Sequence, residues 1–336
     1  MNFNMKAAWY EQTGPAANVL RIGELPLPQP GSGEVLVKVH ASGINPSDTK
    51  MRAGWRNTAM AFPRIVPHAD GAGEVVAIGP AADSALLHRR VWVYNATALY
   101  DASRGLGTAA EYCALPAGQV VPLADGTAYE QGACLGVPAC TAHRAVFSEG
   151  PVDGQTILVQ GGAGCVAHYA IQLATLSGAR VIATVSSAQK AAHARAAGAQ
   201  DTVLYTGEDV VQRVRDLTGG QGVDRIIEVD LGANLAVDVQ LIKNNGHIAS
   251  YSSTSVPEPV LPYYALAYKG VNLRLVQGFN LPSAARNAAI RDITHWCERG
   301  QLQHAVGAVF NLEQIALAHE AVEQRTVMGN VVVKIS

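Results

Sequence analysis

The stretch that decides the fold is Thr156–Ala170, which reads TILVQGGAGCVAHYA. Within it, Gly162, Gly164 and Ala167 match the spacing G-x-G-x-x-G/A of a dinucleotide-binding turn. An apolar, strand-like run precedes the turn and a helical pattern follows it, which is the context that this motif requires. Such a turn lets the backbone approach a pyrophosphate, while the helix N-terminus attracts the negative charge. The stretch therefore predicts a strand–turn–helix unit that binds a dinucleotide.

The residues after the next strand indicate which dinucleotide is bound. An NAD-binding domain usually carries an Asp or Glu about 20 residues after the first glycines, where it accepts hydrogen bonds from the ribose. No Asp or Glu lies between Asp153 and Asp201 in this chain. The second strand is instead followed by Ser186, Ser187 and Lys190, whose hydroxyls and ammonium suit a 2′-phosphate. Lys190 and the basic residues after it can alternatively form a solvated helix face, but the missing acid favours NADP(H).

The composition of the 336-residue chain excludes several classes of protein. Hydrophobic residues make up 49% and charged residues 15%, so the chain is neither disordered nor highly charged. A net charge of −2 disfavours a nucleic-acid surface, and no apolar run approaches the roughly 20 residues that span a bilayer. The N-terminus lacks the apolar core of a signal peptide, and the five cysteines are scattered. We therefore expect a cytoplasmic protein that binds neither nucleic acid nor membrane.

Two sequence patterns divide the chain into two domains. Residues 1–128 contain short strand-like runs separated by Pro and Gly clusters, whereas residues 129–268 alternate helices with strands. Repeated βα units predict a doubly wound parallel sheet of the Rossmann type. Residues 269–336 are too few for a core of their own and are expected to complete the N-terminal domain. The predicted fold class is α/β, with the substrate in the cleft between the Rossmann domain and a β-rich catalytic domain.

Four further blocks accompany the glycine turn along the chain, namely Gly43–Asp48, Pro67–Gly73, Gly107–Tyr112 and Leu135–Ala142. Their order and spacing resemble the zinc-free quinone oxidoreductase (zeta-crystallin-like) branch of the medium-chain dehydrogenase/reductase superfamily. The resemblance covers essentially the whole chain and implies a GroES-like catalytic domain around the Rossmann domain. It also implies NADPH as the hydride donor and a small-molecule acceptor, a quinone or another activated alkene.

The resemblance further implies roles for individual residues. Asn45 stands where zinc-dependent relatives carry a catalytic cysteine, and in this branch the asparagine contacts the cofactor or the substrate. Thr141 corresponds to the residue beside the nicotinamide, while Lys190 and Tyr205 correspond to residues around the adenosine phosphate. The full set expected to bind the cofactor is Asn45, Thr141, Gly161, Gly162, Ala163, Gly164, Cys165, Val166, Ser186, Ser187, Lys190, Tyr205 and Ser252.

Lys50 is the clearest departure from the family pattern, which has a tyrosine at that place. Its ammonium can bind a polarised oxygen of the acceptor or point into solvent, and solvent is favoured because lysines are seldom buried. Asn45 and Lys50 are the candidate catalytic residues, with Asn45 as the best donor of a hydrogen bond to the oxygen that gains charge.

No metal is expected. The ligand positions of the zinc-dependent relatives hold Asn45 and Ala69 here, while His68 is displaced by one residue and interpreted as a loop or rim residue. The sequence contains no Cys-x-x-Cys and no His-Glu-x-x-His. Without a Lewis acid the enzyme needs an acceptor that is already electrophilic, such as a quinone.

Two other functions stay open at this point. One is reduction of an enone or enoyl thioester, and the other is NADPH binding with little turnover, as lens crystallins of this family suggest. The resemblance also implies a homodimer or homotetramer in which Rossmann sheets pair edge to edge. The strand expected over residues 272–276 is placed to form that edge.

Overall fold

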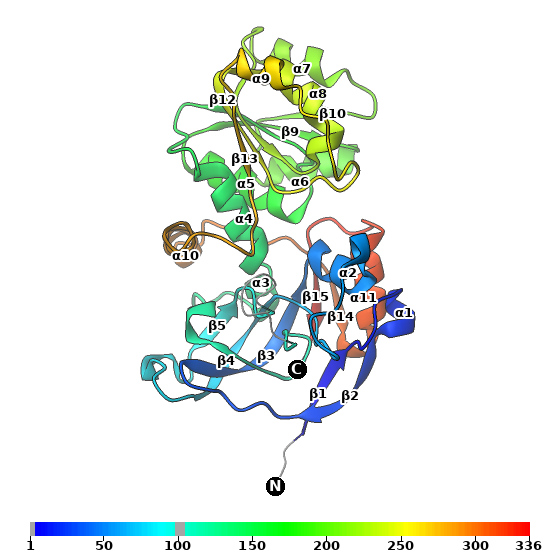
Figure 1. The fold of residues 1–336 in the computed structure, drawn as a ribbon. Helices are drawn as coiled ribbons and strands as arrows, with labels where there is room; N and C mark the ends of the chain where they lie inside the picture. The colour runs from blue at the N-terminus through cyan, green and yellow to red at the C-terminus, as the bar shows by residue number, and fades with distance from the viewer. Residues whose placement is uncertain (1–3, 98–104) are drawn as a thin grey trace. The chain divides into compact units, whose positions relative to one another are not determined.

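The computed structural model describes residues 4–97 and 105–336, and these form two compact units (Figure 1). One unit comprises Ala139–Ala289, and the other comprises Met1–Pro138 together with Ile290–Ser336. The boundaries expected from the sequence, 128/129 and 268/269, fall earlier in the chain. The second boundary lies later because β13 (Asn272–Leu275) pairs with a strand of the unit Ala139–Ala289.

A parallel sheet forms the centre of the unit Ala139–Ala289, with the strand order β10-β9-β8-β11-β12-β13. Its other strands are β8 (Thr156–Val159), β9 (Arg180–Val185), β10 (Asp201–Leu204), β11 (Val223–Glu228) and β12 (Ile242–Ser250). The order reverses between β8 and β11, where the chain crosses from one half of the sheet to the other. This is the doubly wound Rossmann arrangement that the sequence predicts, and nucleotides bind at such a reversal. We call this part the Rossmann unit.

The apolar character of these short strands explains their burial. Leu158, Ile182, Val203, Ile226 and Ile248 come from five neighbouring strands and pack into one core. Burial of side chains of this size contributes about 1.5–3 kcal/mol each. Helices flank the sheet (Figure 1): α5 (Cys165–Leu176), α6 (Ala188–Ala196), α7 (Val210–Leu217), α8 (Leu231–Leu241) and α9 (Tyr263–Ala267).

The other unit, here called the N-terminal unit, is built on a sheet of order β14-β15-β3-β4-β5-β7, with β6 also paired to β3. The strands are β3 (Glu34–Ile44), β4 (Asp70–Ile78), β5 (Arg90–Val93), β6 (Tyr112–Pro116), β7 (Val120–Pro122), β14 (Val306–Asn311) and β15 (Asn330–Lys334). A separate pair is formed by β1 (Asn4–Trp9) and β2 (Arg21–Pro26). The C-terminal segment completes the main sheet, because β15 pairs antiparallel with β3.

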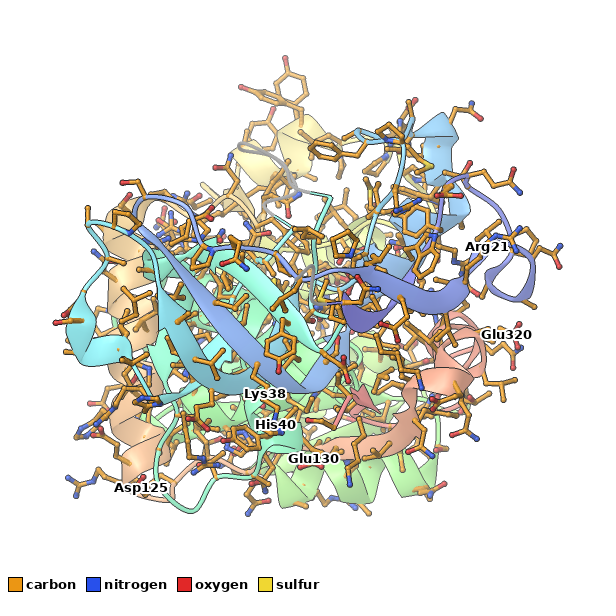
Figure 2. All side chains as sticks on the ribbon, turned by 90° about the horizontal axis from the view of Figure 1, so that it is seen from below. Arg21, Lys38, His40, Asp125, Glu130 and Glu320 are labelled. Carbon is orange, nitrogen blue, oxygen red and sulfur yellow. The ribbon has the colours of Figure 1, made fainter. Side chains whose placement is uncertain are left out.

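The long strand β3 shows why this sheet forms. Val35, Val37 and Val39 alternate along it and are fully buried, whereas Lys38 and His40 lie on the opposite face (Figure 2). An alternation of period two is what a half-buried strand requires. The strand therefore separates a core from an outer surface.

The helices of the N-terminal unit are short, and two helices cross the division between the units. They are α1 (Ala16–Val19), α2 (Pro46–Ala53), α3 (Tyr129–Gly132) and α11 (Ile315–Glu323), with α4 (Gly136–Phe147) and α10 (Ser283–Glu298) at the division. Within residues 4–97 and 105–336, none of the helices has the length and apolar character needed to cross a membrane.

Candidate cofactor and active site

The glycine turn lies between β8 and α5, and its glycines are needed for different reasons. Gly161 has a φ of +67°, a left-handed conformation that favours glycine. A Cβ on Gly162 would lie 2.8 Å from the Cβ of Ala183, so this glycine permits close packing. Gly164 has a φ of −78°, and a Cβ there would meet only one carbonyl oxygen, at 3.5 Å. The packing of the protein therefore does not require glycine at position 164, and the absent side chain leaves space beside the backbone of the turn.

Hydrogen bonds to the end of β9 hold this turn in place. The backbone N–H of Gly162 donates to the carbonyl of Thr184 at 2.8 Å, and the N–H of Gly161 donates to Thr184 Oγ1 at 3.1 Å. Helix α5 begins directly after Gly164, at Cys165. The backbone N–H groups at the start of α5, together with the glycine turn, are the kind of backbone arrangement that binds phosphate in other proteins. Ala163 and Val166 belong to this same segment.

The residues expected at the adenosine end gather where β9 and β10 end. Ser187 caps α6, since its hydroxyl accepts a hydrogen bond from the N–H of Lys190 at 3.3 Å. Lys190 Nζ donates to Ser186 Oγ at 2.9 Å. Tyr205 is about half exposed, with a side-chain exposure of 52%, and its N–H donates to the carbonyl of Val185. Thr206, which the sequence analysis missed, donates to the carbonyl of Ser186 at 3.3 Å.

Three other expected cofactor residues also lie in the Rossmann unit. Ser252 follows β12, and its carbonyl accepts a hydrogen bond from the N–H of Leu231 at the start of α8. Thr141 is buried in α4. Burial raises the pKa of the Cys165 thiol to about 12, which keeps it protonated at neutral pH. Cys165 is therefore not an activated nucleophile.

Asn45 is the N-cap residue directly before α2 in the N-terminal unit, and it is almost fully buried. Its Nδ2 donates to Asp70 Oδ2 at 2.7 Å, and its backbone N–H donates to Asp48 Oδ2 at 2.7 Å. The register of β3 and β4 pairs Gly43 with Asp70, which brings these groups together. The side chain of Asn45 also hydrogen-bonds to the carboxyl of Asp48, so its amide is held by two carboxyl groups and its orientation is fixed.

Asp70 and Asp48 are the site groups that the sequence analysis did not single out. The backbone N–H of Val137 also donates to Asp70 Oδ2, at 2.8 Å. A Cβ on Gly136 would lie 2.0 Å from Asp70 Oδ1, so the block after α3 wraps closely around this carboxyl. Burial raises the pKa of Asp48 to about 7 and that of Asp70 to about 8. The clearest signal for them was their position in the two blocks that carry Asn45 and Ala69.

Lys50 lies on α2 with its ammonium 4.7 Å from the ring centroid of Trp55, a cation–π contact. Trp55 is itself partly exposed, with 39% of its surface accessible. The structure thus places the Lys50 side chain against an aromatic residue at the surface.

His68 lies in the loop before β4, as one of its two interpretations expected, but it is fully buried, so the alternative of a rim position is wrong. Thr108 Oγ1 donates to the carbonyl of Asp70 at 2.5 Å, so Ser42 Oγ must donate to Thr108 Oγ1, at 2.7 Å. Ser42 Oγ then accepts from His68 Nδ1 at 2.7 Å, and His68 Nε2 accepts from His319 Nε2 at 2.9 Å. Burial lowers the pKa of His68 to about 3, so it is neutral and this direction is fixed. The histidine pair is a buried support for Asp70.

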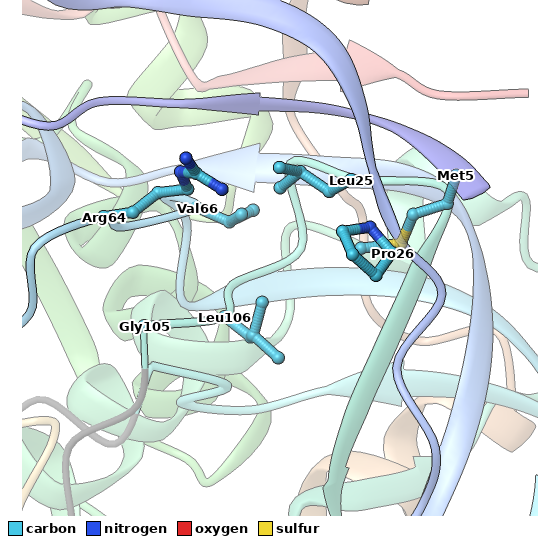
Figure 3. Close-up of a pocket in the computed structure, with 7 residues that line it drawn as sticks. All are labelled: Met5, Leu25, Pro26, Arg64, Val66, Gly105 and Leu106. Carbon is cyan, nitrogen blue, oxygen red and sulfur yellow. The ribbon is translucent and has the colours of Figure 1, made fainter. Parts of the chain in front are cut away.

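Within the described residues, there is no group of three or more His, Cys, Asp or Glu side chains that could hold a metal ion. The N-terminal unit does contain a hollow of about 290 Å³ (Figure 3). It is lined by Met5, Leu25, Pro26, Arg64, Val66, Gly105 and Leu106. None of the expected site residues lines it, so it is separate from the site around Asn45.

Comparisons with known proteins identify the family. Residues 31–125 match the alcohol dehydrogenase GroES-like domain, and residues 165–295 match the zinc-binding dehydrogenase family. A mycobacterial protein solved in complex with NADPH is 31% identical, with a TM-score of 0.84, and the match covers 98% of this chain and all of that one. The chain belongs to the medium-chain dehydrogenase/reductase superfamily.

Members of this superfamily that resemble the chain differ in their named activities. The human quinone oxidoreductase is 29% identical over 93% of this chain and 91% of its own length. A solved NAD-dependent alcohol dehydrogenase is 29% identical, with a TM-score of 0.88 and coverage of 99% of this chain and all of that one. The family prediction and the predicted fold class are confirmed, and the chain is an oxidoreductase.

Proposed function

We propose that the chain is an NADPH-dependent reductase that transfers hydride to a quinone-type acceptor without a metal. The observation that carries this proposal is the glycine turn at the reversal of the Rossmann sheet, with Gly164 free of any packing need. Ser186 and Lys190 lie together at the adenosine end and suit a 2′-phosphate. The NADPH-bound mycobacterial relative supports the same choice of cofactor.

The residues of the N-terminal unit supply orientation and hydrogen bonding. When bound, NADPH supplies a hydride, and solvent supplies the proton that completes reduction of a quinone to the hydroquinone. Asp70 and Asp48 hold the amide of Asn45 between them, and this fixed amide would contact the nicotinamide or the acceptor oxygen as that oxygen gains charge. Binding of the acceptor between the two domains stays a prediction.

A panel of acceptors tests the proposal. Steady-state NADPH oxidation is measured with quinones, enones and enoyl thioesters at matched concentrations. We expect the highest kcat/KM with quinones. A higher value with enones would assign the chain to activated-alkene reduction, and tight NADPH binding without turnover would assign it a binding role.

Metal independence is tested separately. The positions of zinc ligands in relatives hold Asn45 and Ala69. We expect full activity after exhaustive chelation and no stoichiometric zinc by elemental analysis. Activity that is lost on chelation and restored by zinc would contradict the proposal.

We also propose that the chain is a homodimer or homotetramer. The strand β13 lies at the end of the parallel sheet, and Leu275 on it is 72% exposed. Pairing with a second copy would cover such an edge. Light scattering at micromolar concentration is the test, and a monomeric mass would contradict it.

A further inference from the structure

Two carboxyl groups of the Rossmann unit meet in its interior. Glu228 ends β11 and Asp238 lies in α8, both side chains are fully buried, and they form a hydrogen bond with each other. Among the described residues, neither Glu228 Oε2 nor Asp238 Oδ2 receives a hydrogen bond from a third group. Two carboxyl oxygens attract each other only when one carries a proton. The pair therefore shares one proton and one negative charge.

The partners of the pair indicate which carboxyl holds the proton. Glu228 Oε1 accepts hydrogen bonds from the backbone N–H of Asp230 and from Asn234 Nδ2, the latter at 2.9 Å. Two donors on one oxygen favour the charged form of Glu228. Asp238 Oδ1 accepts from Gln160 Nε2 at 2.9 Å, so the proton of Asp238 lies on Oδ2, which faces Glu228.

A directed chain of hydrogen bonds joins this pair to the glycine turn. Gln160 uses its Nε2 for Asp238, so its Oε1 is left to accept, and Thr184 Oγ1 donates to it at 2.6 Å. Because Thr184 Oγ1 donates its only proton to Gln160, it can act only as an acceptor toward Gly161, whose N–H donates to it at 3.1 Å. In this series of hydrogen bonds, the donor or acceptor role of each group is set by the bond that it makes to the next group. The Gln160 amide therefore keeps its orientation because Asp238 carries its proton on Oδ2, toward Glu228, and presents Oδ1 as an acceptor.

We propose that the proton shared by Glu228 and Asp238 positions the cofactor turn, by fixing Gln160 and, through Thr184, the backbone of Gly161. Glu228 and Asp238 are positioning residues, since they act on the turn only through Gln160 and Thr184. The inference rests on the proposed role of the turn in NADPH binding. Loss of the shared proton would add a second negative charge to the hydrogen-bonded chain that holds a site for a pyrophosphate anion.

Single amide substitutions should preserve the arrangement. In Asp238→Asn, the new Nδ2 donates to Glu228 while Oδ1 still accepts from Gln160. In Glu228→Gln, the new Nε2 donates to Asp238, which then accepts two hydrogen bonds as a carboxylate. Each variant keeps one negative charge and one hydrogen between the two side chains, and the hydrogen bonds of Gln160 and Thr184 keep their directions, although in Glu228→Gln the bond within the pair runs from residue 228 to Asp238. We expect each to bind NADPH within about twofold of the parent chain, because no buried group loses its partner.

The double variant Glu228→Gln/Asp238→Asn should behave differently. Two NH2 groups then face each other. This repulsion is removed only if the side-chain amides of residue 238 and of Gln160 both flip. Thr184 would lose the acceptor for its proton. We expect the Kd for NADPH to rise about tenfold, the effect of one buried hydrogen bond lost. Adenosine 2′-monophosphate, which lacks the pyrophosphate, should bind with unchanged affinity, and this separates the turn from general unfolding.

Thr184 provides a test that does not depend on the carboxyl pair folding correctly after substitution. Thr184→Val keeps the shape but removes the hydroxyl between Gln160 and Gly161, so the Kd for NADPH should rise while that for adenosine 2′-monophosphate is unchanged. Thr184→Ser restores the hydroxyl and should restore binding. Asp224→Asn is the control, because Asp224 binds the N–H of Thr156 at the other end of β8. It should leave both affinities unchanged.

The pH dependence adds a second readout. Burial and the charge of Glu228 raise the pKa of Asp238 well above its usual range. Below that pKa the proton is in place, and as pH rises through it the affinity for NADPH should fall. In Asp238→Asn this fall should be absent. The other titratable groups that act on the pair are Asp230, whose charge raises the pKa of Glu228, and Tyr251, which has Cys165 beside it.

The outcomes separate this inference from the proposed function. If the parent chain does not bind NADPH, the proposed function fails. If it binds NADPH but the double variant and Thr184→Val bind it equally well, the positioning role is wrong. The role is also wrong if Asp238→Asn alone weakens binding as much as the double variant, or if affinity for adenosine 2′-monophosphate falls in parallel in every variant.

Discussion

The two groups of candidate site residues, one in each unit and called here the backbone half and the side-chain half, are held in different ways. In the Rossmann unit, the segment proposed to bind the cofactor is a run of consecutive backbone groups between β8 and α5. In the N-terminal unit, the central group is the side chain of Asn45, held by Asp70 from a neighbouring strand. A backbone site is specified by residues that leave space, whereas a side-chain site is specified by residues that provide partners. Substitutions should therefore harm the two halves through different measurable quantities.

The largest effect is expected at Asn45. If its amide stabilises charge on the acceptor oxygen or fixes the nicotinamide, Asn45→Ala should lower kcat/KM by about ten- to a thousandfold, as for other lost transition-state donors. The Kd for adenosine 2′-monophosphate should not change, because that ligand is bound by the Rossmann unit. Steady-state kinetics with the best quinone and a binding titration check this. Full activity in the variant would show that other groups position the reaction.

The next largest effect is expected at the glycines of the turn. It tests which glycine is needed for packing within the protein and which is needed for close approach of the cofactor. Gly164→Ala should leave the melting temperature unchanged, since its φ and surroundings accept a Cβ, but raise the Kd for NADPH about tenfold or more by blocking close approach. Gly162→Ala is the matched contrast, because its Cβ would meet Ala183 and should lower the melting temperature. If Gly164→Ala binds NADPH normally, the pyrophosphate does not approach at this residue.

A smaller effect is expected at the adenosine end, where side chains rather than backbone recognise the cofactor. Lys190→Ala removes one charged partner of a 2′-phosphate and should raise the Kd for NADPH about tenfold, the scale of one charge-assisted hydrogen bond. The Kd for NADH should barely change. Binding titrations with both dinucleotides decide it. A parent chain that prefers NADH would contradict the choice of NADPH.

The sequence predicted the local structure around the glycine turn well, because its signals are local. The run Ile157–Val159, the glycine turn and the helix after it all lie where they were expected, in β8 and α5. Apolar periodicity and turn chemistry act between residues close together in the chain. The expected strand at 272–276 also appears, as β13. Because β13 pairs within the Rossmann sheet, the second domain boundary lies later in the chain than the change of sequence pattern suggested.

The sequence predicted the side-chain half only in outline. Asn45 was singled out, but its bond to Asp70 depends on the antiparallel register of β3 and β4. The burial of His68 in its loop was missed because its partner His319 comes from the other end of the chain, 251 residues away. The pair Glu228 and Asp238 was missed for a related reason, since a carboxyl on a strand and one on a helix show no spacing motif. Such contacts follow from tertiary packing rather than from any local pattern.

The smallest effect is expected at Lys50, and it tests whether the side-chain half of the site extends to the surface of α2. Its ammonium contacts the ring of Trp55, an interaction worth about 0.5–1 kcal/mol when exposed, so Lys50→Ala should lower kcat/KM by less than about fivefold. Lys50→Met keeps the aliphatic stem against the ring and serves as the control for packing. Both variants are compared with Asn45→Ala using the same quinone. If Lys50→Ala and Lys50→Met are as damaging as Asn45→Ala, the ammonium binds the acceptor oxygen and replaces the tyrosine of the family pattern.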